Sequence, residues 1–433
     1  MSLQQPGLGW KPCLLGFEPY WTAEPKIDVI EKIARQKLGW PQRCSVRVFA
    51  QGAFNKLYEI RCENRGFLMR VSLPVDPRCK TVSEVATLEL VRQYTEIPAP
   101  KVIAFDASND NELGFEWMLM EKMPGQPLGE RWKEMSFATK QTLVKRLALL
   151  VAQLFRKKFH LLGNLYHSNR HDADPNPAEE LGVQASAQSA LSKKFVVSKI
   201  VSMEFFWADH IKQDVPRGPF TTSQEWLSAR LLFHQNDSQR TLKTSNDEDD
   251  LEDARGIAEI VRKLRSCLPL VFGSGPEASP EPSTLLHDDL SRQNILVDED
   301  GNLTAVVDWE CVSALPLWKA CQLPAFLHGR ERNERPVKGN YFVEEDGEVN
   351  ELYWEHLLEH EQTLLCSTFL EEMQRLESGW VDVYMKSSNR RKADFELAVQ
   401  NCDIDFCIRD ISIWLDKVAQ GAEVPDLRKL FRG

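Results

Sequence analysis

The sequence has no long apolar segment. No run within its 433 residues approaches the ~18 apolar residues that a membrane-spanning helix requires. The first residues also lack the basic and apolar regions of a secretory signal and the Arg-rich amphipathic pattern of an organelle leader. We therefore expect a cytoplasmic protein that makes no contact with a membrane.

The sequence also lacks closely paired cysteines. Ten cysteines are scattered between Cys13 and Cys407 with no C-x-x-C pair, and the nearest two, Cys402 and Cys407, have four residues between them. Dispersed cysteines in a chain of this length indicate reduced, mostly buried thiols, because a disulfide framework is typical of small secreted domains.

A surplus of basic residues is missing as well. The 53 Lys and Arg are outnumbered by 64 Asp and Glu, which gives a formal net charge of −11. Binding of nucleic acid requires clustered positive charge, so a nucleic-acid partner is not expected. The hydrophobic content of 42% is typical of a soluble globular protein. A chain of this length exceeds one core, so two lobes or domains are predicted.

One segment, residues 285–310, carries a specific pattern. It contains His287-x-Asp289, then Asn294 four residues later, and it ends at Asp308 and Glu310. Two short β-prone runs, 295–297 and 303–307, flank a turn-forming stretch and predict a β-hairpin. A hairpin returns the chain to its starting end, so we expect Asn294 and Asp308 to lie close together.

The residue types in this segment suit phosphoryl transfer. Mg²⁺ is a hard cation that prefers oxygen ligands, and carboxylates and an amide supply them. In kinases, an Asp of this loop orients the hydroxyl that is phosphorylated, while an Asn and a later Asp hold the metal. The pattern thus predicts Asp289 as the catalytic residue and Asn294 and Asp308 as metal ligands. His287 is expected to support the loop, and Glu310 either assists or is only an acidic residue at a helix start.

These motifs resemble those of the aminoglycoside phosphotransferase (APH) family and its choline-kinase-like relatives, in particular its fungal branch. The D-W-E sequence at 308–310 is typical of small-molecule kinases, whereas protein kinases have D-F-G. The resemblance spans roughly residues 45–330. It implies an α+β, two-lobed, protein-kinase-like fold, with a small antiparallel N-lobe that has one helix and a mostly helical C-lobe. It also implies ATP and Mg²⁺ as cofactors and a small-molecule hydroxyl as the phosphate acceptor.

The same resemblance predicts a division of the chain. Residues 1–44 are expected to form an N-terminal extension, 45–122 a nucleotide-binding N-lobe, 123–330 a catalytic core with a helical insertion, and 331–433 a helical C-terminal part. Because some relatives of this type are mitochondrial, the mitochondrion is the alternative location. The acceptor (amino sugar, choline-like alcohol, homoserine-like metabolite or sugar) and the oligomeric state stay open.

The resemblance also assigns residues to nucleotide binding. Residues 51–56, between two strand-like runs, resemble the family's nucleotide loop, which covers the phosphates with backbone amides, and Gly52 and Asn55 are assigned to it. With one glycine, this loop taken alone would be an ordinary hairpin turn. The next predicted strand, 67–71, has Arg70 where the family has a phosphate-binding Lys. The two residue types are not interchangeable, so the geometry is expected to differ.

Two further positions follow from the family pattern. The predicted helix 83–91 carries Glu84 at the position that pairs with this basic residue, and Glu89 is the less favoured choice. The strand 115–121 and the linker after it match the hinge that binds adenine. Met120 is assigned to line the adenine pocket, and Glu121 and Met123 are assigned as backbone partners.

The remaining segments are less specific. We expect a helix over 137–162, a loop insertion or small hairpin over 163–195, and a linker over 274–283. The acidic run 246–250 is interpreted as a solvated loop that caps a helix over 251–268. The region 330–433 is expected to be helical and to contribute to the acceptor pocket.

Three alternatives are left by the sequence. A catalytically weak, kinase-like nucleotide-binding or scaffold protein is suggested by Arg70 and by the single glycine of the nucleotide loop. A protein kinase is disfavoured, because no H-R-D, D-F-G or A-P-E motif is present. Residues 356–360 have the H-x-x-E-H form of a zinc peptidase. A charged surface helix that carries two histidines is the preferred interpretation of that motif.

Overall fold

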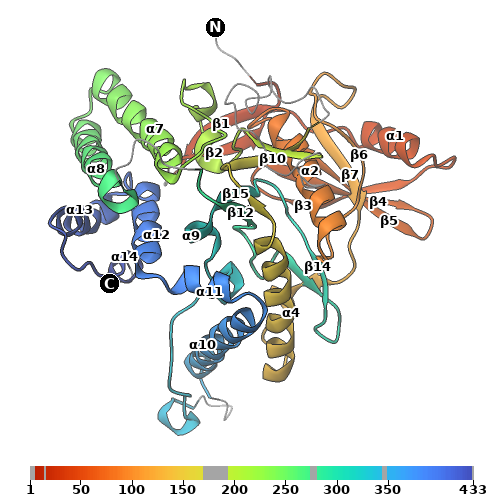
Figure 1. The fold of residues 1–433 in the computed structure, drawn as a ribbon. Coiled ribbons are helices and arrows are strands. Elements are labelled where there is room, and N and C mark those ends of the chain that lie inside the picture. Colours follow the sequence, from red (N-terminus) through yellow and green to blue (C-terminus); the bar gives the residue numbers. More distant parts are fainter. Residues whose placement is uncertain (1–4, 14–15, 169–193, 274–279, 344–348, 432–433) are drawn as a thin grey trace.

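The computed structural model describes residues 5–13, 16–168, 194–273, 280–343 and 349–431. An antiparallel sheet with helices packed on it forms the first part of the chain, and a mostly helical part follows (Figure 1). The expected two-lobed α+β fold class is therefore confirmed.

Five antiparallel strands form the N-terminal sheet, in the order β3-β4-β5-β7-β6. They are β3 (Ser45–Gln51), β4 (Asn55–Cys62), β5 (Arg65–Ser72), β6 (Val102–Asp106) and β7 (Glu116–Glu121). The two strand-like runs on either side of residues 51–56 correspond to β3 and β4, and the strand predicted over 67–71 lies inside β5. Side chains alternate between the two faces of a strand, so Met69 and Arg70 of β5 face opposite ways.

One helix covers each face of this sheet. On the first face, α1 (Ile27–Leu38) contributes Ile30 to a core cluster that includes Ile60 and Met69 of the sheet. On the other face, α2 (Cys79–Tyr94) contributes Leu88 to a separate core cluster that includes Met120. Arg70 lies on the α2 side. The segment expected as an N-terminal extension thus packs a helix on the sheet. It also forms a separate hairpin of β1 (Leu8–Cys13) and β2 (Gly16–Trp21).

The prediction that the cysteines are reduced was wrong for one pair. Cys44 and Cys62 form a disulfide, while the other eight cysteines form no disulfide in the described structure. The two residues are 18 positions apart in sequence, but the β3–β4 hairpin pairs Ser45 with Arg61 and so brings the flanking cysteines together. Sequence spacing alone did not reveal this pairing, because it depends on the register of the two strands.

The chain leaves the sheet through a short linker and enters the helical part. The elements that follow are β8 (Gln126–Pro127), α3 (Leu128–Arg131) and α4 (Phe137–Phe155). The predicted helix over 137–162 was too long, since α4 ends at Phe155. The Thr284 hydroxyl donates to the carbonyl of Leu154, and β9 (Lys158–Phe159) pairs with β12 (Ser283–Leu286). Tertiary pairing therefore ends the helix.

A second antiparallel sheet lies within the C-terminal part, in the order β11-β10-β15-β12-β9. Its other strands are β10 (Gly163–His167), β11 (Phe195–Ser198) and β15 (Ser313–Pro316). Because β10 and β11 pair, the hairpin alternative for the segment 163–195 is supported at its two ends. Residues 169–193 of that segment and most of the predicted linker, 274–279, lie outside the described residues.

The hairpin predicted after Asn294 is confirmed. It consists of β13 (Ile295–Val297) and β14 (Leu303–Val306), and β8 pairs with β13 as a third strand. The Asp298 carboxylate accepts hydrogen bonds from the backbone N–H groups of Asp300 and Asn302, which closes the turn. Gly301 adopts a φ of +83°, a conformation that favours glycine.

Helices make up most of the remaining chain. They are α6 (Met203–Phe206), α7 (Ser223–Thr244), α8 (Glu248–Phe272), α9 (Leu317–Ala320), α10 (Glu351–Leu376), α11 (Ser378–Met385), α12 (Ser387–Gln400), α13 (Asp405–Ala419) and α14 (Leu427–Leu430), with 3₁₀ turns at His210–Lys212, Ala325–Leu327 and Lys338–Asn340. The predicted acidic cap is present: the Asp247 side chain accepts hydrogen bonds from the N–H groups of Asp249 and Asp250. Across the described ranges, no helix has both the length and the apolar character needed to span a membrane.

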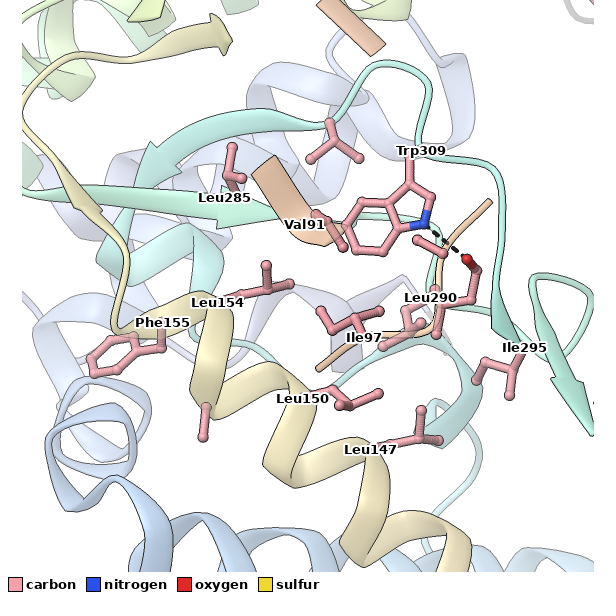
Figure 2. Packing of buried hydrophobic residues seen from close by; sticks show 14 of the residues in the cluster. Val91, Ile97, Leu147, Leu150, Leu154, Phe155, Leu285, Leu290, Ile295 and Trp309 are labelled. Atoms are coloured by element: carbon pink, nitrogen blue, oxygen red, sulfur yellow. Dashed lines mark hydrogen bonds between the residues drawn. The ribbon is translucent and has the colours of Figure 1, made fainter. Parts of the chain in front are cut away.

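The largest core cluster joins the two lobes. Figure 2 shows Val91 and Ile97, from the end of α2 and the segment after it, close to Leu150 of α4 and to Trp309. The Trp309 indole N–H donates to the carbonyl of Val306 at 2.9 Å. Since Trp309 follows Asp308 directly, this core lies immediately beneath the segment that carries the predicted metal ligand.

Candidate active site

The predicted catalytic loop closes on itself. Asn294 Nδ2 donates to Asp289 Oδ2 at 2.7 Å and to the Asp289 backbone carbonyl at 3.0 Å. The side chain of Asp289 is exposed. The Asn294 amide thus orients a carboxylate that remains open to solvent, and its own Oδ1 takes part in neither hydrogen bond because Nδ2 makes both.

The hairpin brings Asn294 next to Asp308. The backbone N–H of Val307 donates to the carbonyl of Asn294 at 2.9 Å. His287 Nε2 bonds the Val307 carbonyl at 3.0 Å, and its ring meets the Trp309 ring edge-on with centroids 4.8 Å apart. Burial lowers the pKa of His287, so a neutral ring that donates to the carbonyl holds the two segments together.

Asp308 has an unusual backbone conformation. Its φ is +63°, in the left-handed region that residues with a side chain rarely adopt. Such strain costs about 1–3 kcal/mol and persists where the surrounding structure enforces it, most often at functional sites. The contacts of Val307 and Trp309, on either side of Asp308, provide that enforcement.

Arg70 contacts the carboxylates of this site from the sheet. One terminal nitrogen contacts Glu84 of α2, and the other lies 3.6 Å from Asp308 Oδ1 and 3.8 Å from Glu310 Oε2. Glu89, the less favoured partner, contacts Lys194 at 2.5 Å instead. The ion pair between the third strand and α2 is therefore formed by Arg70 and Glu84.

Sequence reasoning missed Lys80, a second buried cation at the site. Its Nζ lies 2.5 Å from Glu310 Oε2 and 3.1 Å from Asn55 Oδ1. The Asn55 amide in turn donates to Glu310 Oε2 at 2.8 Å. Lys80 precedes Glu84 by four residues, which places both on one face of α2, and this spacing was the signal available in the sequence.

Charge and burial shift the two acidic side chains in opposite directions. Burial raises the pKa of Asp308, and repulsion from Glu310 raises it further. Burial acts on Glu310 in the same sense, but the charges of Lys80 and Arg70 outweigh it and lower the Glu310 pKa. Glu310 is therefore ionised at neutral pH and held by two cations, whereas Asp308 lies 3.6 Å from the nearest nitrogen of Arg70.

The nucleotide loop, residues 51–56, turns back between β3 and β4. The Gly52 N–H donates to the Asn55 carbonyl at 2.9 Å, and nothing lies within 4 Å of the position where a Cβ of Gly52 would be. Phe54 is buried and meets Phe206 of α6 edge-on at 5.4 Å. The Asn55 side chain points inward to Lys80 and Glu310, so it links the loop to the site.

The three residues predicted to form the hinge lie at the end of β7 and in the linker that follows it. Met120 of β7 pairs with Leu68 of β5, and both pack against the α2 side of the sheet. The Glu121 N–H donates to the Lys101 carbonyl at 3.0 Å. Met123 lies in the linker after β7. Met120 thus faces the same side of the sheet as Arg70, whereas the Glu121 N–H is used within the protein.

The oxygen atoms of Asn294 and Asp308 fit a magnesium ion. Asn294 Oδ1 and the Asp308 carboxylate are hard oxygen donors on adjoining segments. No group of three or more His, Cys, Asp or Glu arranged to hold a metal is found in the described part of the chain. Mg²⁺ does not need such a cage, because it usually binds through one or two carboxylates together with water and substrate phosphates.

The H-x-x-E-H motif on α10 does not form a zinc site. His356 Nδ1 bonds the Tyr341 hydroxyl at 2.7 Å, and His360 Nδ1 bonds the Arg332 carbonyl at 3.1 Å. The Glu359 carboxylate accepts from Arg332 at 2.8 Å. These partners belong to the neighbouring loop, which supports the interpretation as a helix that carries two histidines.

A buried carboxyl anchors the start of α2. Glu116 of β7, 2% exposed, accepts hydrogen bonds from the Arg78 N–H at 2.8 Å and the Thr81 hydroxyl at 2.5 Å. Burial raises its pKa to about 7. The protonated form is favoured in the folded state, so its stabilising effect is complete below the ordinary Glu pKa and is lost as the pH rises through about 7.

We expect Glu116→Gln to remove this pH dependence. Between pH 5 and pH 8, the stability of the variant should rise relative to the natural protein by up to about 3 kcal/mol, since the neutral amide needs no proton. Urea unfolding of both proteins at several pH values measures the difference. If the stabilities of the two proteins changed with pH in parallel, Glu116 would already be ionised in the folded protein.

The chain is similar in sequence to several known proteins. A subtelomeric hrmA-associated cluster protein of Aspergillus fumigatus is 24% identical over 315 residues, which are 64% of this chain and 60% of that protein. The mitochondrial protein named altered inheritance of mitochondria protein 9, from Eremothecium gossypii, is 22% identical over 342 residues, 69% of this chain and 54% of its own length. The chain thus spans little more than half the length of these curated relatives.

Solved structures give a more distant likeness. A thermostable mutant of aminoglycoside phosphotransferase APH(4)-Ia, in ternary complex with ADP and hygromycin B, is 14% identical with a TM-score of 0.40, and the match covers 90% of this chain and 97% of that one. At the level of families, residues 45–318 match the phosphotransferase enzyme family, APH. This match includes the sheet, α2, the catalytic loop and the hairpin. The chain belongs to the phosphotransferase enzyme family.

Proposed function

We propose that this protein is a small-molecule kinase, which transfers the γ-phosphate of ATP·Mg²⁺ to a hydroxyl of its substrate. The observation that carries the proposal is the arrangement at one junction of Asp289, bonded to Asn294, and Asp308, facing Arg70. Residues 45–122 would bind the nucleotide, and residues 123–330 with 331–433 would supply the catalytic loop and the acceptor pocket.

The catalytic loop orients the acceptor. Asp289 is exposed and is held by the Asn294 amide, so its free oxygen accepts a hydrogen bond from the attacking hydroxyl. The transferred phosphoryl group is loosely bonded in the transition state, and for this reason positioning matters more than basicity. The proton passes to Asp289 late, as the new bond to phosphorus forms.

The donor side holds the metal and the nucleotide. Asn294 Oδ1 and the Asp308 carboxylate are the residues that would bind Mg²⁺, which when bound neutralises the negative charge of the phosphates. Arg70 clamps the phosphates, and its contact with Glu84 fixes the guanidinium. Met120 lines the adenine pocket, and the backbone near Glu121 and Met123 meets the adenine edge.

The acceptor is proposed as a class, a small molecule that carries a hydroxyl. The names of the relatives describe gene clusters and mitochondrial inheritance, and they specify no substrate for this chain. Several relatives are named as mitochondrial. We therefore propose the cytoplasm, with the mitochondrion as the alternative compartment.

Calorimetric titration with ATP tests this function. We expect the natural protein to bind ATP more tightly with Mg²⁺ than without it, and Asp308→Ala to abolish that dependence by removing the principal oxygen ligand. Asp298→Ala, on the solvated turn of the hairpin, is the matched control and should retain it.

The outcomes distinguish the two functions that the sequence left open. Mg²⁺-dependent binding that Asp308→Ala removes, followed by release of ADP with some hydroxyl acceptor, supports the kinase. Nucleotide binding without ADP release across a panel of acceptors supports the catalytically weak binding protein. Absence of nucleotide binding in the natural protein contradicts both.

A further inference from the structure

Lys80 lies where three parts of the candidate site meet. It belongs to the first turn of α2, one helical turn before Glu84. Its Nζ contacts Asn55, which is part of the nucleotide loop, and Glu310, which follows Asp308 by two residues. Only 2% of Lys80 is exposed. The ammonium is therefore enclosed between the helix, the loop and the segment that carries the metal ligand.

Packing alone does not account for a buried charge at this position. Removing an ammonium from water costs several kcal/mol, and apolar residues of similar volume often replace buried ion pairs without loss of stability. Glu310 also has other partners, since the Asn55 amide donates to it and Arg70 lies 3.8 Å away. Lys80 therefore adds a second cation, beside Arg70, at the segment that carries Asp308 and Glu310.

The other phosphate-binding groups of the site are largely engaged. Both terminal nitrogens of Arg70 lie next to carboxylates, those of Glu84 and Asp308. The Gly52 N–H closes the turn of the nucleotide loop by donating to Asn55. This loop has a single glycine, so it offers few close-approaching backbone amides. A triphosphate in this site would therefore need a further donor.

We propose that Lys80 binds the phosphates of the donor nucleotide, beneath the nucleotide loop. The assignment rests on the proposed kinase function and adds a phosphate-binding residue to it. An ammonium has three N–H donors, and the contacts with Glu310 and Asn55 use two of them. Lys80 thereby complements an arginine whose planar group is fixed by its carboxylate partners.

A nucleotide series measures this role directly. ATP, ADP and adenosine are titrated at constant Mg²⁺ into the natural protein, Lys80→Met and Lys80→Gln, and the unfolding midpoint of each protein is recorded. Lys80→Gln keeps a hydrogen-bond donor near Glu310, so it serves where Lys80→Met does not fold.

Lys140 provides the matched control. It is also a lysine that is only 2% exposed, and it belongs to α4. There its Nζ contacts Glu361 Oε2 at 2.7 Å and lies 5.1 Å from the centre of the Trp132 ring. Lys140→Met thus removes a buried charge that is paired with one glutamate, without touching the candidate site.

The affinity of the Lys80 variants for ATP and ADP should fall roughly tenfold to a hundredfold, as expected for loss of a charge-assisted hydrogen bond. Their affinity for adenosine should stay unchanged, and Lys140→Met should bind all three compounds normally. Equal losses for ATP and adenosine would reveal a structural role and overturn the assignment. Normal ATP binding by the variants would overturn it as well, whereas absence of ATP binding in the natural protein would contradict the kinase function itself.

Discussion

Replacement of Asp289 by Asn is expected to lower phosphoryl transfer by roughly a hundredfold to ten-thousandfold, the usual range for loss of a general base. Asn has the shape of Asp, so the contacts with Asn294 are largely kept, but it does not accept the hydroxyl proton. Nucleotide affinity should stay close to normal, because Asp289 contacts neither Arg70 nor Lys80. Release of ADP, with and without hydroxyl acceptors, measures the loss.

The neighbouring carboxylate serves as the control for this variant. Asp288 is also exposed, but it lines a cavity against Lys319 of α9 on the other side of the catalytic loop. Asp288→Asn removes one negative charge at an adjacent position and should retain turnover within a few-fold. Equal losses in the two variants would indicate that the net charge of the loop matters, and the specific role of Asp289 would then be wrong.

Much of the fold could be predicted from local sequence patterns. The strands of the N-terminal sheet, the hairpin after Asn294 and the cap at Asp247 all depend on residues close together in the chain. The end of α4 at Phe155 could not, because it depends on pairing with β12, more than a hundred residues later. The Cys44–Cys62 disulfide was missed for a related reason, since only the register of two strands brings these residues together.

In the candidate site, too, features set by nearby residues could be predicted and features set by distant residues could not. The catalytic loop and Asp308 were identifiable because one continuous segment contains them. The environment of Lys80 was not, because its partners Asn55 and Glu310 are 255 residues apart and meet only in the folded chain. A lysine near a helix start is usually solvated, so its sequence position carried no sign of burial. The i, i+4 relation to Glu84 becomes informative once Glu84 is known to face the site.

Replacement of Trp309 by Ala should cause a large loss of stability, about 3–5 kcal/mol, as is usual when a large aromatic residue is removed from a core. The indole is 1% exposed, packs among residues of both lobes and donates to Val306 (Figure 2). It also supports the His287 ring, which holds Val307 beside Asp308. Urea unfolding measures the stability of the variant, and titration with ATP·Mg²⁺ measures the affinity of its candidate site for the nucleotide.

A second buried tryptophan serves as the control that distinguishes a loss of core packing from a loss of support for the candidate site. Trp414 of α13 is fully buried and its N–H donates to the Pro425 carbonyl at 3.1 Å, but it belongs to the core cluster of α7, α8 and α13. Trp414→Ala should lose comparable stability and still bind ATP·Mg²⁺ normally wherever it is folded. Trp309→Ala should bind more weakly under the same conditions, because the strained φ of Asp308 is no longer enforced. Equal affinities in the two folded variants would mean that Trp309 contributes packing alone, and that His287 and the hairpin suffice to hold Asp308 in place.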